Sequence, residues 1–465
     1  MKKIISYYLT VIMLVLMFGQ AFVVNSTTTY AKTNSWPTAP DLVGETAILI
    51  EPNSGTILYE KNSHKKMYPA SITKIMTALL TIENCKMNEK VVYSKQNINS
   101  IQPGDANIGC QIGEEMTVKD CLYALMLSSA NETARALAEH ISGSCDAFAQ
   151  LMNERAKQAG AKDTHFANPN GLHDPNHYVT AFDMAMIMKA AIKYPVFLDI
   201  IHTTEYTLPK NNKRKTPYPS YQRHKMIYST SEYYDPDVVG GKTGYTDQAG
   251  KTLVTYAKRG DLDLISVVMK SKDEQTIFTD TRKLLDYGFN NFQYVNVSKN
   301  DTRFDSDTDT LLKSPFSTDI ANIVIDSSAN ILVPKNTKVS DLDTTVTFKS
   351  EGDSFARITY KYGDKVLGTA KIKYLTSESK NKESTESSTT VTTTTNNVKE
   401  TVASQKQSTT KVNKKTSKSD NTNSNLELIL PILIIIIIIV VIIFIFAMQR
   451  RKINRVRAMK RNRNR

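Results

Sequence analysis

The stretch "YPASITKIM", residues Tyr68 to Met76, determines how the rest of the chain is interpreted. Ser71 and Lys74 stand three residues apart in it, where an apolar pattern typical of a buried helix begins, formed by Ile72, Ile75, Met76, Leu79 and Leu80. At ~100° per residue the two polar side chains leave the helix on one side, roughly 60° apart. The pair is either two solvated side chains or a nucleophile beside its base. Further Ser-x-x-Lys matches lie in polar surroundings without an apolar stripe, at Ser63, Ser377, Ser379 and Ser408.

The N-terminus carries the pattern of a secretory signal. Lys2 and Lys3 precede an apolar run from Ile4 to Val24, and the small residues of "TYA" end at Ala31. This order of basic, apolar and small residues predicts a signal peptide over residues 1–31, cleaved after Ala31. An uncleaved anchor is the alternative.

The C-terminus carries the pattern of a membrane span. Residues 428–448 contain no charge and would extend about 30 Å as a helix, which is the thickness of the hydrocarbon core of a bilayer. Residues 450–465 follow with nine Lys and Arg and no acid. Because basic flanks mark the cytoplasmic side, we expect one transmembrane helix at 428–448, a cytoplasmic tail at 449–465 and a body outside the cell membrane, on the bacterial cell-wall side.

Most of the excess charge belongs to these ends. The formal net charge is +13; without the nine positive charges of the tail and the two of Lys2 and Lys3, about +2 remains. The body is therefore not predicted to bind nucleic acid, and the basic ends are expected to contact membrane lipid. Cys85, Cys110, Cys121 and Cys145 show no metal-ligand spacing, so no metal site is expected. They allow three disulfide pairings or free thiols.

Composition divides the body into three parts. Residues 36–290 mix strand and helix patterns. Residues 291–376 contain short strand-like runs separated by turns, which predict a small β-rich domain. Residues 377–425 are mostly Ser, Thr, Lys and Asn and cannot bury a core, so they are predicted to form a disordered stalk.

The first part is predicted to be an α+β domain. "ETAILIEPNSGTILYEKN" (45–62) and "GKTLVTYAKRGDLDLISVVMKS" (250–271) each predict a strand pair. Helical patterns lie between them, at 71–83, 118–128, 132–141, 145–158 and 181–191. Strands at both ends with helices between them favour an antiparallel sheet with a helical insertion packed on it.

Two further motifs favour the interpretation of Ser71 as a nucleophile. "MLSSANETARALAEH" supplies Ser129 and Asn131 just before a helix, where helix capping is the simpler interpretation of either residue. "GGKTGYTDQAG" supplies Lys242, Thr243 and Gly244 at the expected start of a strand, and its glycines indicate close approach of the backbone to a ligand. His177, in the turn-rich "FANPNGLHDPNHYVTAFDMA", is expected to support the site rather than react.

The set Ser-x-x-Lys, Ser-x-Asn and Lys-Thr-Gly is shared by penicillin-binding proteins and serine β-lactamases. Over about residues 40–375 the chain resembles low-molecular-weight penicillin-binding proteins, the D-alanyl-D-alanine carboxypeptidases. "MNERAKQAGAKDTHFANPNGL" and "KLLDYGF" are similar to that subfamily. The transmembrane span departs from relatives that attach through a terminal amphipathic helix.

The resemblance implies a role for each residue. Ser71 would be the nucleophile and Lys74 its neutral base, with a pKa lowered by burial and by the cation of Lys242. Ser129 would pass the proton to the leaving D-alanine, and Asn131 would hold the substrate amide. Lys242 and Thr243 would bind the terminal carboxylate of a peptidoglycan stem peptide. The backbone N–H groups of Ser71 and Tyr245 would form the oxyanion hole. No cofactor is needed, and β-lactam antibiotics would acylate Ser71.

Three alternatives remain open at this point. One is a different enzyme on the same fold, either a β-lactamase or an endopeptidase that cuts peptidoglycan cross-links. Another is a penicillin-recognising sensor, although the basic tail is too short for a folded output domain. The third is an inactive wall-binding module, against which the intact motif set argues.

Overall fold

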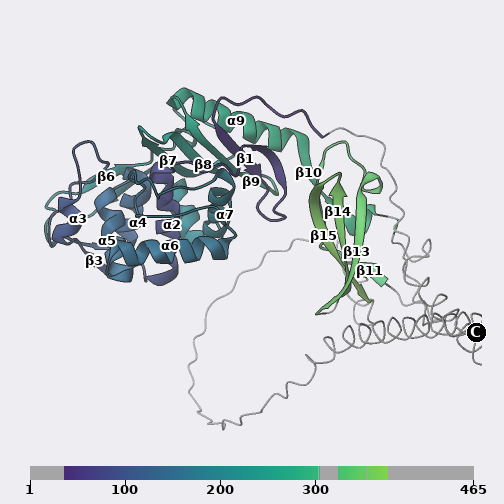
Figure 1. The fold of residues 1–465 in the computed structure, drawn as a ribbon, viewed down its shortest axis with the longest axis horizontal. Helices are drawn as coiled ribbons and strands as arrows, with labels where there is room; N and C mark the ends of the chain where they lie inside the picture. Colours follow the sequence, from purple (N-terminus) through teal and green to yellow (C-terminus); the bar gives the residue numbers. More distant parts are fainter. Residues whose placement is uncertain (1–35, 302, 304–322, 353, 375–465) are drawn as a thin grey trace, which may run out of the picture. The chain divides into compact units, whose positions relative to one another are not determined.

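The computed structural model describes residues 36–301, 303, 323–352 and 354–374, and one five-stranded antiparallel sheet organises the larger part of them (Figure 1). Its strand order is β2-β1-β9-β8-β7. The bounds are β1 (Thr46–Ile50), β2 (Ile57–Lys61), β7 (Val238–Thr246), β8 (Gly250–Arg259) and β9 (Leu262–Ser271). β1 pairs with β9, so that Ala47 faces Val268 across the ladder. The sheet therefore closes by pairing early and late segments, as the sequence predicts for this α+β fold.

Alternating side chains give the sheet two buried faces. Ile48 and Val267 belong to a core shared with the helices inserted between β2 and β7, whereas Leu49 and Val268 belong to a second core shared with α9 (Glu274–Asn291). Because successive strand residues point to opposite faces, a continuous apolar run is needed where both faces are covered. The run "TAILI" of β1 meets this requirement, and all five of its residues are buried.

The inserted helices follow the predicted pattern closely at four of five places. They are α2 (Lys74–Asn84), α5 (Asn131–Ser142), α6 (Cys145–Ala159) and α7 (Ala181–Ala191). The Thr180 hydroxyl accepts the N–H of Asp183 and caps α7 at its N-terminus. Ahead of α2 a 3₁₀ turn, η1 (Ala70–Thr73), contains Ser71, so the α-helix begins at Lys74 rather than at the predicted Ser71.

The predicted helix over 118–128 is not one regular helix. It consists of α4 (Val118–Tyr123) followed by a π-helical turn, η2 (Ala124–Ser128). Ser129 then adopts a left-handed backbone with φ of 61° and ends the segment. π-Helical turns insert a residue into the helical repeat and occur frequently at functional sites. The apolar periodicity of the sequence gave no sign of this interruption.

Shorter elements complete the part that carries the sheet. Those not predicted from the sequence are β3 (Lys90–Val92), α3 (Lys95–Asn99), β4 (Glu115–Thr117), α8 (Pro195–His202), β5 (Glu205–Leu208), β6 (Tyr218–Tyr221) and η3 (Lys225–Ile227). β3 pairs with β4, and β5 pairs with β6. All four cysteines are free thiols.

The residues that follow α9 form β structure around a small core of their own. A four-stranded sheet has the order β11-β15-β14-β13, and β10 pairs with β12. The core includes Ile331, Ile358, Tyr360 and Ile372. The elements are β10 (Phe292–Asn296), α10 (Val297–Asn300), β11 (Ile323–Ile325), β12 (Asn330–Pro334), η5 (Val339–Asp341), β13 (Asp343–Glu351), β14 (Ser354–Tyr362) and β15 (Lys365–Tyr374).

Four predicted segments lie outside the described residues: the signal peptide at 1–31, the stalk at 377–425, the transmembrane helix at 428–448 and the tail at 449–465. None of the helices in the described part of the chain combines the length and the apolar character that crossing a bilayer requires.

Candidate active site

Ser71 lies in the 3₁₀ turn η1, one residue after a strained backbone position. Ala70 has φ of 50°, which is unusual for a residue with a side chain. Ser71 lines a cavity of about 580 Å³, and Lys74, the first residue of α2, directs its amine to the Ser71 hydroxyl. The Nζ atom of Lys74 lies 2.9 Å from Ser71 Oγ. The predicted nucleophile and base are therefore within hydrogen-bonding distance.

The amine of Lys74 has two further contacts, and both are with carbonyl oxygens. It donates to Asn131 Oδ1 at 2.7 Å and to the backbone carbonyl of Asn170 at 2.7 Å. A carbonyl oxygen can only accept, whereas a serine hydroxyl can donate or accept. A neutral amine has two N–H groups and one lone pair. If the two N–H groups serve the carbonyls, the lone pair remains for the Ser71 O–H, which is the arrangement of a general base.

The environment of Lys74 favours the neutral form. The side chain is fully buried, and burial is the largest cause that holds its pKa well below its usual value. The cations of Lys242 and then Arg223 lower the pKa further, while Glu132 opposes them. Burial removes the hydration on which an ammonium group depends, and like charges nearby act in the same direction.

Ser129 follows the π-helical turn and faces the same cavity. Its side chain is buried, and its Oγ atom has no hydrogen-bond partner within the part of the chain that the structure describes. A buried hydroxyl without a partner costs free energy. Two residues later, Asn131 begins α5 and contacts Lys74. The left-handed Ser129 thus lets the chain present both side chains of the Ser-x-Asn motif to the cavity.

Lys242, Thr243, Gly244 and Tyr245 lie in β7, at the edge of the sheet. The sequence placed them at the start of a strand, but β7 begins at Val238 and Lys242 is its fifth residue. The prediction was wrong on this point, because Gly240 and Gly241 lie inside β7 rather than before it. Thr243, Gly244 and Tyr245 line the cavity directly.

Gly244 brings β7 against the nucleophile turn. A Cβ atom at this position would lie 2.8 Å from the backbone nitrogen of Ser71 and 2.4 Å from Thr252 Oγ1. The Thr252 hydroxyl in turn donates to the carbonyl of Pro69 at 2.9 Å. Only glycine permits this approach, so the backbone groups of the strand and of the turn can reach the same ligand.

Lys242 is fully buried behind the cavity wall, and its Nζ donates to the carbonyl of Thr243 at 3.0 Å. Burial, followed by the cation of Arg223, lowers its pKa to about 7. Arg223 itself lines the cavity. Arg223, and Lys242 in its protonated form, therefore provide cations that would attract an anionic group such as a carboxylate.

Several residues of the site escaped the sequence analysis. Arg223 belongs to no recognised motif, and Asn170 acts through its backbone carbonyl, which sequence does not reveal. Gly171 has φ of 85°, and a Cβ there would lie 1.9 Å from the carbonyl oxygen of Ala70. The segment "NPNGL" could have been identified as a tight turn, but not as one that packs against η1.

Glu132 was also missed. It is buried, and its Oε1 accepts the backbone N–H of Ile108 at 2.7 Å. Burial raises the pKa of this carboxyl. The contact holds the loop from Pro103 to Cys110, of which residues 103–106 line the cavity. Glu132 therefore shapes one rim of the site.

His177 supports the nucleophile turn from behind. Its Nδ1 accepts the N–H groups of Ala167 and Asn168 at 3.0 and 3.3 Å, so the proton resides on Nε2. Nε2–H then donates to Thr73 Oγ1 at 2.9 Å. Burial lowers the pKa of His177 to about 3, which keeps the ring neutral. This geometry agrees with the supporting role predicted for it.

Comparisons with known proteins agree with one another. The family model described as D-alanyl-D-alanine carboxypeptidase matches residues 32–273. D-alanyl-D-alanine carboxypeptidase DacF of Bacillus subtilis is 36% identical over 300 residues, covering 63% of this chain and 72% of that protein. DacC of Escherichia coli, another D-alanyl-D-alanine carboxypeptidase, is 34% identical over 275 residues, covering 57% of this chain and 66% of that protein.

Solved structures show the same relationship. Penicillin-binding protein 5 of Haemophilus influenzae superimposes with a TM-score of 0.59 at 27% identity, over 73% of this chain and 98% of that one. The DD-transpeptidase of Streptomyces K15 gives a TM-score of 0.51 at 26% identity, over 54% and 99%. With its three motifs gathered at one cavity on this fold, the chain belongs to the D-alanyl-D-alanine carboxypeptidase family of serine peptidases.

Proposed function

We propose that this protein removes the terminal D-alanine from peptidoglycan stem pentapeptides through an acyl-enzyme on Ser71. The observation that carries the proposal is the position of the Lys74 amine, held by two carbonyl acceptors with its third contact on the Ser71 hydroxyl. Membership of the D-alanyl-D-alanine carboxypeptidase family identifies the reaction as a peptide hydrolysis.

In the first step, Ser71 Oγ attacks the carbonyl carbon of the penultimate D-alanine while Lys74 accepts the hydroxyl proton. The N–H groups of Ser71 and Tyr245 stabilise the oxyanion, and removing one such donor in a comparable hydrolase costs about 3 kcal/mol. Asn131 holds the substrate amide, and Lys242 and Thr243 bind the terminal carboxylate. The buried Ser129 hydroxyl, without a partner of its own, passes a proton to the leaving nitrogen.

The amide C–N bond then breaks, and D-alanine leaves with that proton. In the second step, water attacks the ester on Ser71, and the shortened peptide is released with Ser71 restored. A β-lactam presents a strained amide and a carboxylate to the same groups. It forms the same ester bond, and its ring nitrogen takes the proton without leaving the molecule.

We propose further that the enzyme acts outside the cell membrane, on the cell-wall side. The signal pattern at 1–31, the apolar segment at 428–448 and the basic tail at 449–465 support a single span with membrane lipid around it. The net charge of about +2 that remains without the basic ends supports no role with nucleic acid. Protease added to intact protoplasts should remove the body and spare a C-terminal tag. A tag cleaved under those conditions would refute this topology.

The reaction is tested with the full-length chain and a synthetic pentapeptide ending in D-Ala-D-Ala. We expect release of one D-alanine per peptide, and mass spectrometry after exposure to penicillin should locate the adduct on Ser71. Ser71→Ala should abolish both. Undiminished D-alanine release by Ser71→Ala would eliminate the proposed nucleophile.

A further inference from the structure

Two helices lead from the active site to a second group of reactive side chains. α2 begins with Lys74 and ends next to Cys85, and α5 begins with Asn131 and has His140 in its last turn. The first residues of the two helices share a hydrogen bond in the site. At 1.5 Å per residue, their C-terminal ends lie about 15 Å along from it.

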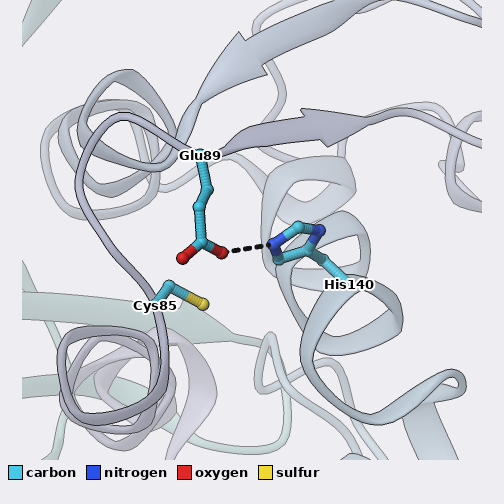
Figure 2. A group of neighbouring side chains, drawn as sticks. All are labelled: Cys85, Glu89 and His140. Atoms are coloured by element: carbon cyan, nitrogen blue, oxygen red, sulfur yellow. Dashed lines mark hydrogen bonds and ion pairs between the residues drawn. The ribbon is translucent and has the colours of Figure 1, made fainter.

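Cys85, Glu89 and His140 meet at these C-terminal ends (Figure 2). The Cys85 Sγ, a Glu89 carboxylate oxygen and a ring nitrogen of His140 all lie within 4.8 Å of one another. His140 Nε2 donates to Glu89 Oε2 at 3.2 Å. The other oxygen of Glu89 accepts the N–H of Lys86 at 2.8 Å, which fixes the carboxylate against its own turn.

This donor set suits a zinc-type ion. Zn²⁺ is bound by thiolate, imidazole and carboxylate groups in a tetrahedral arrangement, with bonds of about 2.0–2.3 Å. Those bond lengths place neighbouring ligand atoms roughly 3.3–3.7 Å apart. The contact between His140 and Glu89 is already close to this separation, and the thiol needs a shift of at most about 1 Å. The half-buried thiol and the partly exposed ring and carboxylate leave room for an ion to enter.

The backbone adds a second and independent attraction for a cation. The C-terminal end of a helix carries a partial negative charge, because its last carbonyl groups lack partners within the helix. Both α2 and α5 end at this cluster. A cation bound there would face two such ends as well as the Glu89 carboxylate.

A simple ion pair does not account for the whole cluster. It explains why Glu89 faces His140 but not why the Cys85 thiol, which packs at the edge of the main core, lies beside them. Cys110 and Cys121 are different, because both are buried in the main core against Met116 and Tyr93. Cys145 belongs to no group of possible metal ligands in the described part of the chain.

We propose that Cys85, Glu89 and His140 bind a zinc-type divalent ion, with water as the fourth ligand. Coordination replaces the proton of the Cys85 thiol, which passes to solvent, and displaces the hydrogen of His140 Nε2 to the other ring nitrogen. The ion joins the far ends of the two helices that carry Lys74 and Asn131. The site is separate from the peptidase reaction and does not depend on it.

The test uses the untagged full-length chain, freed of metal with a chelator and titrated with zinc chloride against a chromophoric competitor. We expect one ion per chain, and a higher midpoint of thermal unfolding with zinc. Cobalt chloride should give a thiolate charge-transfer band. Cys85→Ser and His140→Ala should each weaken zinc binding by at least about 100-fold, since removing even outer partners of a metal site costs 10- to 100-fold.

Matched controls are available in the same chain. Cys145→Ser removes the other half-buried thiol, and His202→Ala removes a histidine that also lies in the last turn of a helix. Both should bind zinc like the parent chain. Absence of binding by the parent chain, or equal binding by Cys85→Ser and the parent, overturns the proposal. A cobalt spectrum without the thiolate band overturns it as well.

Discussion

Lys74 and Lys242 are both fully buried at one cavity, yet the protein surrounds them differently. Lys74, at the start of α2, meets two carbonyl acceptors and a hydroxyl. Lys242, in the middle of β7, has one side-chain hydrogen bond within the described part of the chain, to the carbonyl of the next residue. Burial is the first cause of a lowered pKa in both. The difference therefore lies in what each amine can still bind.

This difference separates a base from a carboxylate anchor. The contacts of Lys74 are already saturated by groups of the protein, and a neutral amine fulfils all of them. Among the residues that the structure describes, Lys242 retains N–H groups without acceptors, which a substrate carboxylate would satisfy while restoring the ammonium form. Two lysines whose pKa values are lowered by the same physical cause can thus serve as a base in one case and as a carboxylate anchor in the other.

Substituting arginine for each lysine in turn should give the largest difference in acylation rate. Arginine remains protonated at any relevant pH, so Lys74→Arg should lose the base and slow acylation by about 10²–10⁴-fold. Lys242→Arg keeps the cation and should stay within roughly tenfold of the parent chain. Acylation by a chromogenic β-lactam measures both. Similar losses in the two variants would mean that the lysines do not differ in role.

Removing the charge of Lys242 should mainly weaken substrate binding. Lys242→Gln should lower kcat/KM for a D-Ala-D-Ala peptide by about 30- to 5,000-fold, the cost of truncating one partner of a buried charge pair. The acidic limb of the pH profile should move only slightly to higher pH, because Lys242 ranks behind burial among the causes that lower the pKa of Lys74. A large shift of that limb would show that charge dominates over burial.

The alkaline limb should belong to Lys242. Its pKa of about 7 in the free enzyme means that the cation needed for carboxylate binding is lost as the pH rises above that value. kcat/KM for the peptide should therefore fall above about pH 7, since this constant reports the free enzyme. Lys242→Arg should maintain kcat/KM to higher pH. An unchanged alkaline limb in Lys242→Arg would assign it to another group.

The smallest effects on activity should come from substituting two buried histidines. His177 lies behind the turn that precedes Lys74, and His224 lies next to β7, which contains Lys242. His177 donates to Thr73, and His224 Nε2 contacts Thr255 Oγ1 at 2.8 Å, next to β7. A neutral hydrogen bond contributes about 1 kcal/mol, so each change to Gln should cost up to about tenfold. His177→Gln should slow acylation, whereas His224→Gln should raise the KM for the peptide. A higher KM in His177→Gln together with slower acylation in His224→Gln would contradict these separate roles.

These histidines also predict how stability depends on pH. Burial lowers the pKa of each to about 3, below the value of about 6.5 expected in the unfolded chain. The unfolded state therefore binds more protons, and stability should fall as the pH drops below 6.5, by up to about 1.4 kcal/mol per unit for each ring. Chemical denaturation at several pH values should show a shallower slope for His177→Gln. A slope equal to that of the parent chain would exclude this contribution.

The motifs were predictable because each is local, whereas the contacts that activate them are not. Spacing identified Ser71, Lys74, Ser129, Asn131 and the Lys-Thr-Gly segment. The structure places Ser71, Ser129, Asn131, Thr243 and Gly244 at one cavity, with Lys74 and Lys242 fully buried. The Asn170 carbonyl and Arg223 depend on how distant loops pack, for which the sequence has no pattern. The π-helical turn before Ser129 is hidden for a similar reason, because apolar residues fill it as they would an α-helix.

The strained backbone at the site has a consequence for engineering this protein. Ala70 and Ser129 are two of the four non-glycine residues with positive φ in the described part of the chain. Each such position costs about 1–2 kcal/mol, which glycine would recover. A selection for thermostability alone would therefore favour glycine at both. A chain with glycine at position 129 would lack the hydroxyl that is proposed to deliver the proton. The substitution that raises thermal stability there would therefore lower the turnover rate.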